Sequence, residues 1–337
     1  MNRDKFRNDV FERDSYKCVI CGNPGQDAHH IIERRLFADG GYYLDNGATL
    51  CGEHHILAEE TILSCDELRS RIGIQTILLP EHLYPDYSYD KWGNIILPNG
   101  NRLRGELFYD ESVQKILKPI LHRFVKYVKY PRTYHLPWST RTKDDRIMSD
   151  TSCFEGKRVI VTIKMDGENT TMYTDYIHAR SLDSDNHDSR NWVKNLHNKI
   201  GYNIPDEWRV CGENLYAKHS IHYQNLKNYF QVFSIWNEVN VCLSWDETLD
   251  YCQLLGLGHV PILYDGIWDE AKIKQLYNEK DLSGDDMEGY VVRVADEFFY
   301  GNFKISIAKF VRPNHIVDVV HNWKHTQIIK NYLTTVR

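Results

Sequence analysis

The sequence predicts an α+β protein with more than one domain, and three observations support this. The chain has 337 residues, more than the ~100–150 of a typical domain. Cysteines and histidines cluster within the first 60 residues. From residue 131 onward, segments rich in β-branched and aromatic residues alternate with helical patterns. These shifts divide the chain into residues 1–60, a connector over residues 61–130 and a β-rich part over residues 131–337.

Composition excludes several classes of protein. Hydrophobic residues make up 42% and charged residues 26%, an ordinary globular balance. Because the net charge is −6, nucleic-acid binding must depend on local basic patches. No uncharged apolar run approaches the ~18 residues that span a bilayer, and the charged N-terminus does not resemble a secretory signal. We therefore expect a cytoplasmic protein without membrane association, whose scattered cysteines are free thiols or metal ligands.

Local patterns predict individual elements. A helix is expected over residues 64–72, and Asn99-Gly100 between two apolar runs predicts a hairpin turn. A lysine-bearing amphipathic helix is expected around residues 111–129. In the β-rich part, a capping box that begins at Ser244 starts the clearest helix, and Gly256 marks its expected end.

Basic residues concentrate between positions 115 and 146, where nine stand against two acidic residues. One interpretation is a solvated helix face. The other is a strip that contacts nucleic-acid backbone, which the interleaved tyrosines and tryptophan favour. On that interpretation, we expect Lys126, Lys129 and Arg132 to contact phosphates. The nine basic residues are Lys115, Lys118, Arg123, Lys126, Lys129, Arg132, Arg141, Lys143 and Arg146.

Two cysteine- and histidine-bearing pairs near the N-terminus have zinc-ligand spacing. Cys18 and Cys21 form the first pair, and Cys51 and His54 form the second. Two-residue gaps in both pairs allow all four side chains to point at one tetrahedral Zn²⁺. The sequence therefore predicts a structural zinc site.

Further residues lie between and beside these pairs, namely His29-His30-Ile31-Ile32, Gly40-Gly41, Asn46 and His55. Together with the zinc pairs, residues 8–60 resemble the HNH nuclease module, a ββα-metal fold. The resemblance makes His30 the general base, His29 and His55 ligands of a catalytic divalent ion, and Asn46 the residue that orients the loop. Neutral imidazole can accept a proton at pH 7, and a metal stabilises phosphate charge. The alternative is a zinc-stapled domain that only binds nucleic acid.

A lysine motif, Lys164-Met165-Asp166-Gly167-Glu168, follows the strand-like segment VIVTI. A lysine can attack an α-phosphate when its amine is neutral, and its pKa shifts readily on burial or near other cations. A single motif of this kind is commonly a surface turn. Here five more motifs follow in order, namely His178–Ser181, Cys211–Asn214, Val232–Ile235, Glu288–Arg293 and Ala308–Arg312.

This ordered set resembles the covalent nucleotidyltransferase superfamily, and above all ATP-dependent RNA ligases of the phage and bacterial type, over about residues 130–325. The resemblance makes Lys164 the residue that becomes lysyl-AMP. Asp166 is either a structural turn residue or a substrate contact, and the second is favoured. The other implied roles are Gly167 for close approach of the nucleotide, Arg180 for phosphate, Glu213 for the ribose hydroxyls, Phe233 for stacking on adenine, Glu288 for Mg²⁺ or Mn²⁺, and Lys309 for the α-phosphate.

One position departs from this family pattern. Many relatives carry a second lysine two residues before Lys309, where this chain has Ile307, and Lys304 or Arg312 are the candidates to replace it. Only 25 residues follow Arg312, whereas an OB domain of the kind found in DNA ligases and capping enzymes needs on the order of 70. The resemblance therefore favours an RNA ligase over those enzymes.

The predicted protein is an HNH-type ββα zinc module joined by a connector to a nucleotidyltransferase domain of ATP-grasp-like antiparallel sheets without an OB domain. It would seal 5′-phosphate and 3′-hydroxyl RNA ends through lysyl-AMP and RNA-adenylate, and would also act as a metal-dependent HNH nuclease. The alternatives are a nuclease whose ligase-like half or zinc module only binds nucleic acid, a non-enzymatic binding protein, or a ligase with a DNA strand at one end. The expected partner is RNA, with DNA or hybrid strands left open, and the oligomeric state does not follow from the sequence.

Overall fold

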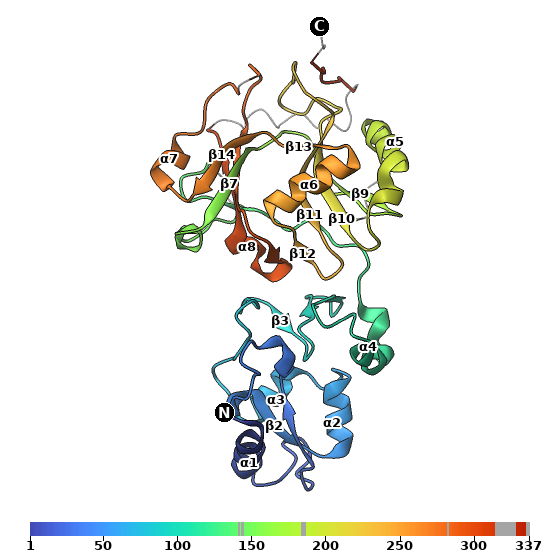
Figure 1. The fold of residues 1–337 in the computed structure, drawn as a ribbon, viewed down its shortest axis with the longest axis vertical. Helices are drawn as coiled ribbons and strands as arrows, with labels where there is room; N and C mark the ends of the chain where they lie inside the picture. Colours follow the sequence, from blue (N-terminus) through green and yellow to red (C-terminus); the bar gives the residue numbers. More distant parts are fainter. Residues whose placement is uncertain (141, 143–144, 183–186, 282, 314–327, 335–337) are drawn as a thin grey trace. The chain divides into compact units, whose positions relative to one another are not determined.

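A computed structural model describes every residue except 141, 143–144, 183–186, 282, 314–327 and 335–337. The chain divides into two compact units, Met1–Lys126 and Tyr127–Arg337 (Figure 1). Residues 61–126, expected as a connector, belong to the first unit. The structure confirms the predicted α+β class, with separate sheets in the two units.

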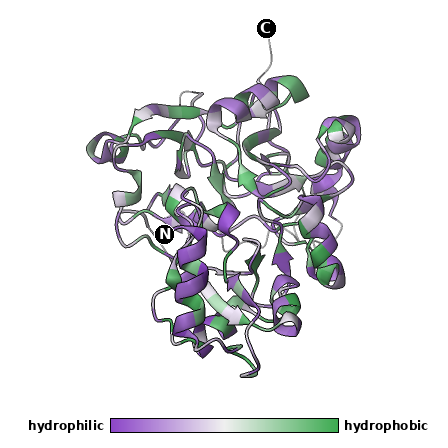
Figure 2. Cartoon of the chain, turned by 60° about the horizontal axis from the view of Figure 1, so that its bottom comes forward, coloured by the Kyte–Doolittle hydropathy of each residue, from purple (hydrophilic) through white to green (hydrophobic). Residues whose placement is uncertain are grey.

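The first unit begins with a helix, which a ββα arrangement follows. Helix α1 (Arg3–Arg13), capped by Asn2, buries Phe6, Val10 and Phe11, whereas its remaining residues are polar, as the purple helix beside the N label in Figure 2 shows. Strands β1 (Asp27–His30) and β2 (Gly47–Leu50) pair antiparallel, and helix α2 (Gly52–Glu59) follows. The resemblance to an HNH module implied such a ββα order.

The remainder of this unit combines short helices with a small sheet. The expected helix at residues 64–72 is present as α3 (Cys65–Arg71), capped by Ser64. The expected hairpin turn lies between β4 and β5, where Gly100 has a φ of +80°. The bounds of the other elements are β3 (Ser88–Tyr89), β4 (Ile95–Ile96), β5 (Arg102–Leu103) and α4 (Glu111–Leu117).

The prediction of a helix over residues 111–129 is wrong beyond Leu117. The α-helix α4 ends there, a 3₁₀ segment covers Lys118–Arg123, and the chain is extended at Phe124. Pro119 explains this change, because proline has no N–H for a helical bond and its ring clashes with the preceding turn.

The described part of the second unit contains two sheets. A seven-stranded sheet has the order β16-β12-β11-β10-β8-β9, with β13 pairing parallel to β11. A five-stranded sheet has the order β14-β7-β15-β17-β6, in which only the β17–β6 pair is parallel. The strands are β6 (Tyr134–His135), β7 (Arg158–Ile163), β8 (Glu168–Met172), β9 (Ile177–Ala179), β10 (Arg209–Asn214), β11 (Phe230–Trp236), β12 (Val241–Cys242), β13 (Gly258–His259), β14 (Ile262–Ile267), β15 (Gly289–Val294), β16 (Phe298–Phe299) and β17 (Ile307–Val311).

Helices accompany both sheets. Helix α6 (Trp245–Leu255) confirms the predicted capping box at Ser244 and ends at Gly256, whose φ is +65°. The other α-helices are α5 (Asn191–Ile200), α7 (Glu270–Lys274) and α8 (Phe303–Ser306). The 3₁₀ segments not yet given are Arg34–Leu36, Leu44–Asn46, Ser152–Phe154, Asp188–Arg190, Gly201–Asn203 and Tyr300–Asn302.

The described core of the second unit contains three buried hydrophobic clusters. One of them includes residues of both sheets, and Phe233 on β11 packs against this cluster and against a second one. Within the described residues, no helix has the length and apolar character needed to cross a bilayer.

Candidate functional site

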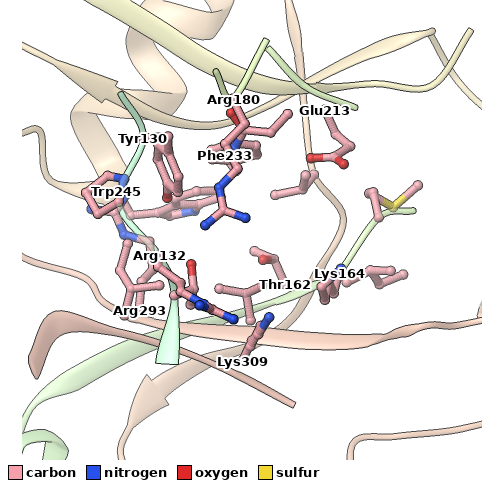
Figure 3. A pocket seen from close by; sticks show the side chains of 18 of the residues that line it. Tyr130, Arg132, Thr162, Lys164, Arg180, Glu213, Phe233, Trp245, Arg293 and Lys309 are labelled. Carbon is pink, nitrogen blue, oxygen red and sulfur yellow. The ribbon is translucent and has the colours of Figure 1, made fainter. Parts of the chain in front are cut away.

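A cavity of about 250 Å³ opens in the second unit, between its two sheets. The five-stranded sheet contributes side chains from β7, β15 and β17, and the seven-stranded sheet contributes side chains from β8, β10 and β11. We call it the inter-sheet cavity (Figure 3). Its walls carry five cationic side chains against two acidic ones, Asp145 and Glu213; the cations are Arg132, Lys164, Arg180, Arg293 and Lys309. A cavity with this lining favours an anionic ligand.

Lys164 stands at the end of β7 and forms an ion pair inside this site. Its Nζ lies 2.5 Å from Glu288 Oε2, and its backbone N–H donates to Gly289 O at 3.0 Å. Burial disfavours the charged form of Lys164, but the carboxylates of Glu288 and Glu213 outweigh burial, so the pKa of Lys164 lies above its ordinary value. The pairing with Glu288 therefore favours the ammonium form of this lysine.

The turn after Lys164 is fixed by neighbouring backbone. Asp166 Oδ2 accepts from Ser220 Oγ at 2.6 Å and from Ile221 N at 2.7 Å. Gly167 leaves no space for a side chain, because a Cβ there would lie 2.5 Å from Asn214 O. Neither Asp166 nor Gly167 is among the described residues that line the inter-sheet cavity. The geometry thus gives Asp166 contacts that stabilise the turn.

Four other residues named from the motifs line the inter-sheet cavity. Arg180 follows β9, Glu213 lies on β10, Phe233 on β11 and Lys309 on β17. Figure 3 shows Arg180 and Lys309 pointing toward one another from opposite walls. Burial raises the pKa of Glu213 to about 8 and, with the charge of Lys164, lowers the pKa of Lys309 to about 8. Both sheets therefore contribute charged groups to one space.

Two cavity cations had no assigned role in this site. Arg132, expected to contact nucleic-acid backbone, lines the inter-sheet cavity, and its Nη2 lies 3.4 Å from Asp145 Oδ1. Arg293 lies directly opposite Ile307 in the β15–β17 register. The sequence signal that could have identified Arg293 was its position at the end of the Glu288–Arg293 motif. Of the proposed replacements for the absent lysine, neither Lys304 nor Arg312 is among the described lining residues.

The predicted basic strip does not form one continuous helix face. The division between the two units falls after Lys126, within the strip. Lys126 and Lys129 are exposed, whereas Arg132 lines the inter-sheet cavity. Arg141 and Lys143 lie outside the described residues.

In the first unit, the four predicted zinc ligands converge. The ligand atoms of Cys18, Cys21, Cys51 and His54 all lie within 4.8 Å of one another. Cys21 Sγ and Cys51 Sγ are 3.8 Å apart, and Cys51 Sγ is 3.2 Å from His54 Nδ1. Because Zn–S bonds are about 2.3 Å, two sulfurs of a tetrahedral site are expected to be about 3.8 Å apart. The donor set and its spacing fit Zn²⁺.

A second group of possible metal ligands lies in the same unit. His29 and His55 come together as expected, and Glu59 joins them. Glu59 Oε1 is 3.3 Å from His29 Nδ1 and 3.4 Å from His55 Nε2. Sequence reasoning missed Glu59, although it follows His55 by four residues on α2 and therefore lies on the same helix face.

Lys91, which sequence reasoning also missed, contacts this second group. Its Nζ lies 3.1 Å from Glu59 Oε1 and donates to His30 O at 3.1 Å. Lys91 is buried, and it comes from a segment far from the histidines in sequence. No local pattern marked it.

His30 faces a separate cavity of about 290 Å³ lined in part by Arg3, Arg7 and Arg34. We call it the arginine-lined cavity. The His30 ring stacks on Phe6 at 4.3 Å, and burial lowers the pKa of His30 to about 4. Asn46 has the loop contacts that its predicted role requires, because its side chain exchanges two 2.9 Å hydrogen bonds with the backbone of Ile32.

Comparison with known proteins gives one family match. Residues 157–311 match the family model described as RNA ligase, and this segment contains Lys164, Glu213, Glu288 and Lys309. No curated protein matches the chain.

Among solved structures, the chain is similar to several forms of an RNA ligase from Naegleria gruberi. A ligand-free lysine-to-alanine mutant has 21% identity and a TM-score of 0.35, covering 47% of this chain and 50% of that one. A glutamate-to-alanine mutant with ATP and manganese has 18% identity and a TM-score of 0.40, covering 58% and 59%. A ligand-free aspartate-to-alanine mutant has 17% identity and a TM-score of 0.40, covering 90% and 79%. The matched part of this chain thus spans between half and three fifths of the length of the first two of these structures.

Proposed function

We propose that the protein is an ATP-dependent RNA ligase whose nucleotidyltransferase site is the inter-sheet cavity. The family match over residues 157–311 supports the class of enzyme. The observation that carries the mechanism is Lys164 Nζ, 2.5 Å from Glu288 Oε2, within a cavity that also holds four arginine or lysine side chains. A nucleophilic amine among cations suits attack on a polyphosphate, because the cations stabilise the negative charge of the transition state.

The reaction proceeds in three phosphoryl transfers. Neutral Lys164 Nζ attacks the α-phosphorus of ATP, a P–N bond forms, and pyrophosphate leaves. The AMP group then passes to the 5′-phosphate of an RNA strand and regenerates the lysine. Finally, a 3′-hydroxyl attacks the activated 5′-phosphate, the phosphodiester forms, and AMP leaves.

The ion pair would make activation of the nucleophile depend on ATP binding. Lys164 is an ammonium while Glu288 faces it, and an ammonium has no lone pair for attack. A Mg²⁺ or Mn²⁺ ion would neutralise phosphate charge and would be held at the Glu288 carboxylate. With Glu288 engaged in this way, the attraction that keeps Lys164 protonated would fall, and the ammonium would lose its proton to solvent before the amine attacks.

The other side chains of the inter-sheet cavity have complementary proposed roles. Phe233 offers a stacking face for adenine, and Glu213 offers oxygens to the ribose hydroxyls. Arg180 and Lys309 would hold phosphates from opposite walls. Lys126, Lys129 and Arg132 are proposed contacts for the RNA backbone, of which Arg132 is the one inside the inter-sheet cavity.

A sealing assay tests this function. We expect the wild type to join a 5′-phosphate strand to a 3′-hydroxyl strand with ATP and Mg²⁺. Lys164→Ala should abolish joining, whereas the matched control Lys157→Ala, an exposed lysine of the same unit, should not. Substrates with RNA or DNA on each side of the junction identify which strand must be RNA. Equal joining by Lys164→Ala would contradict the assignment.

A second function is favoured by a specific observation in the first unit. His30 faces the arginine-lined cavity, and His29, His55 and Glu59 form a possible metal site beside it. We propose a zinc-stapled HNH nuclease in which His30 accepts a proton from water and a divalent ion at the second group stabilises phosphate charge. Arginines around the base fit a nucleic-acid backbone.

Metal-dependent nicking of plasmid DNA and of RNA tests this second function. His30→Ala should abolish cutting, whereas His122→Ala, an exposed histidine of the same unit, should cut normally. If the wild type cuts neither substrate with Mg²⁺, Mn²⁺ or Ni²⁺, the first unit is a binding domain only.

A further inference from the structure

The C-terminal segment 328–334 is held along the loop between β10 and β11. Lys218 N donates to Ile329 O at 2.7 Å, and Leu226 N donates to Tyr332 O at 3.1 Å. An isolated β-bridge also joins Ala217 to Lys330. Backbone pairing therefore ties the end of the described chain to the loop over residues 215–226.

Asn331 is the buried centre of this contact. Its side chain is fully buried, and both of its polar atoms bind backbone of the loop. Nδ2 donates to Leu215 O at 2.8 Å and to Ala217 O at 3.3 Å, while Oδ1 accepts from Tyr223 N at 2.9 Å. A side chain with satisfied donors and acceptors on both sides of a loop fixes the path of that loop.

The same loop holds the turn that follows Lys164. Tyr223 Oη accepts from Asp166 N at 2.9 Å. Ser220 Oγ and Ile221 N both donate to Asp166 Oδ2, at 2.6 and 2.7 Å. Burial raises the pKa of Tyr223 well above its ordinary value, so its hydroxyl stays neutral as the pH rises. The backbone and the side chain of Asp166 are thus both anchored in the loop that Asn331 fixes.

We propose that the C-terminal segment is a positioning element for the nucleophile, acting from Asn331 through Tyr223 to Asp166. Asn331 touches no substrate; it sets the loop, and the loop sets the direction in which Lys164 leaves β7. This inference rests on the proposed role of Lys164 as the residue that is adenylylated. Small displacements of a nucleophile reduce rate strongly, on the order of 10²-fold per ångström.

The test compares Asn331→Ala, Tyr223→Phe, the double variant and the control Thr334→Ala in the full-length protein. Thr334 lies in the same segment with an exposed side chain, and alanine keeps the hydrogen bond from its backbone N to Leu226 O. The rate of lysyl-AMP formation is measured in a single turnover at saturating ATP, together with the KM for ATP and the melting temperature.

We expect Asn331→Ala and Tyr223→Phe each to lower the rate about tenfold or more with little change in KM. The double variant should lose much less than the product of the two losses, because both substitutions break one path. Thr334→Ala should match the wild type.

Rates within twofold of the wild type alongside a lowered melting temperature would overturn the proposal and leave a stabilising role only. Fully multiplicative losses would also overturn it. If Asn331→Ala does not fold, Asn331→Asp decides between these results, because it keeps the acceptor for Tyr223 N and loses the donor to Leu215 O and Ala217 O. A wild type that forms no adduct would instead refute the proposed function, which separates the two failures.

Discussion

Lys164 Nζ lies 2.5 Å from Glu288 Oε2, so the proposed nucleophile and the proposed metal-binding carboxylate form an ion pair. Lys164 directly follows β7 and Glu288 directly precedes β15, and these two strands pair antiparallel. The pairing of the two central strands therefore creates the contact. Its consequence is that the protonation of Lys164 depends on what Glu288 binds.

Glu288→Gln should lower the pKa of Lys164, because the carboxylate attraction disappears while burial remains. The ion pair with Glu288 also decides how Lys164 affects the pH dependence of stability. A lysine pKa that is raised in the folded state adds stability at low pH, and this stability is lost as the pH rises through the folded pKa. The measurement is the pH dependence of amine modification at Lys164 without ATP, read by peptide mass spectrometry. The variant should react at lower pH than the wild type; superimposed curves would show that the ion pair does not control this amine.

Gly167→Ala should damage both folding and adenylylation. Its Cβ would meet Asn214 O at 2.5 Å and Leu215 Cδ2 at 2.8 Å, and the backbone oxygen cannot move without disturbing β10. Overpacking of this kind typically costs about 1–3 kcal/mol. Gly266→Ala is the matched control, because its nearest contact is the hydroxyl end of the Tyr264 side chain. Denaturant unfolding and adduct formation are the measurements, and equal behaviour of the two variants would be the contrary result.

Arg293, rather than Lys304, should supply the positive charge that the absent lysine at position 307 would have given. Arg293 is buried and lines the inter-sheet cavity, and its Nη1 lacks a hydrogen-bond partner among the described residues. A buried guanidinium with an unused donor favours an anion. Arg293→Gln should raise the KM for ATP at least tenfold, with Arg293→Lys intermediate and Lys304→Ala near the wild type. A larger effect of Lys304→Ala would reverse the assignment.

One zinc ion per chain should copurify with the protein. Cys18→Ser and Cys51→Ser should each lower zinc content below about half an equivalent and expose residues 1–60 to protease, because small modules depend on such a staple. Cys153→Ser, a half-buried cysteine of the second unit, is the control and should retain zinc. Adduct formation at Lys164 should persist in all three variants. Full zinc content in the two ligand variants would contradict the assignment.

Local sequence was sufficient to single out residues that the structure brings together. Lys164, Arg180, Glu213 and Lys309 each come from a separate motif, and the structure gathers them around one cavity although nothing in the spacing gives the distances between them. The convergence of the four proposed zinc ligands could also be predicted from the sequence, because a two-residue gap places both side chains of a pair close together.

Residues whose contacts join segments distant in sequence could not be predicted in this way. Glu59 had a weak signal in its four-residue spacing from His55, and Arg293 had one in its motif. Lys91 and Asn331 had none, because each meets its partners only after distant segments pack. The prediction of an α-helix beyond Leu117 was wrong for a local reason. The amphipathic spacing of the side chains continues past Pro119, but the backbone cannot continue an α-helix through this proline.

The account depends most directly on covalent attachment of AMP to Lys164. The decisive measurement is incubation of the purified wild type with α-labelled ATP and Mg²⁺, followed by denaturation and peptide mapping of the label. We predict label on the peptide that contains Lys164, release of pyrophosphate, and no label in Lys164→Ala or Lys164→Arg, because a guanidinium stays protonated. Label on any other residue, or equal labelling of Lys164→Ala, would contradict the central claim.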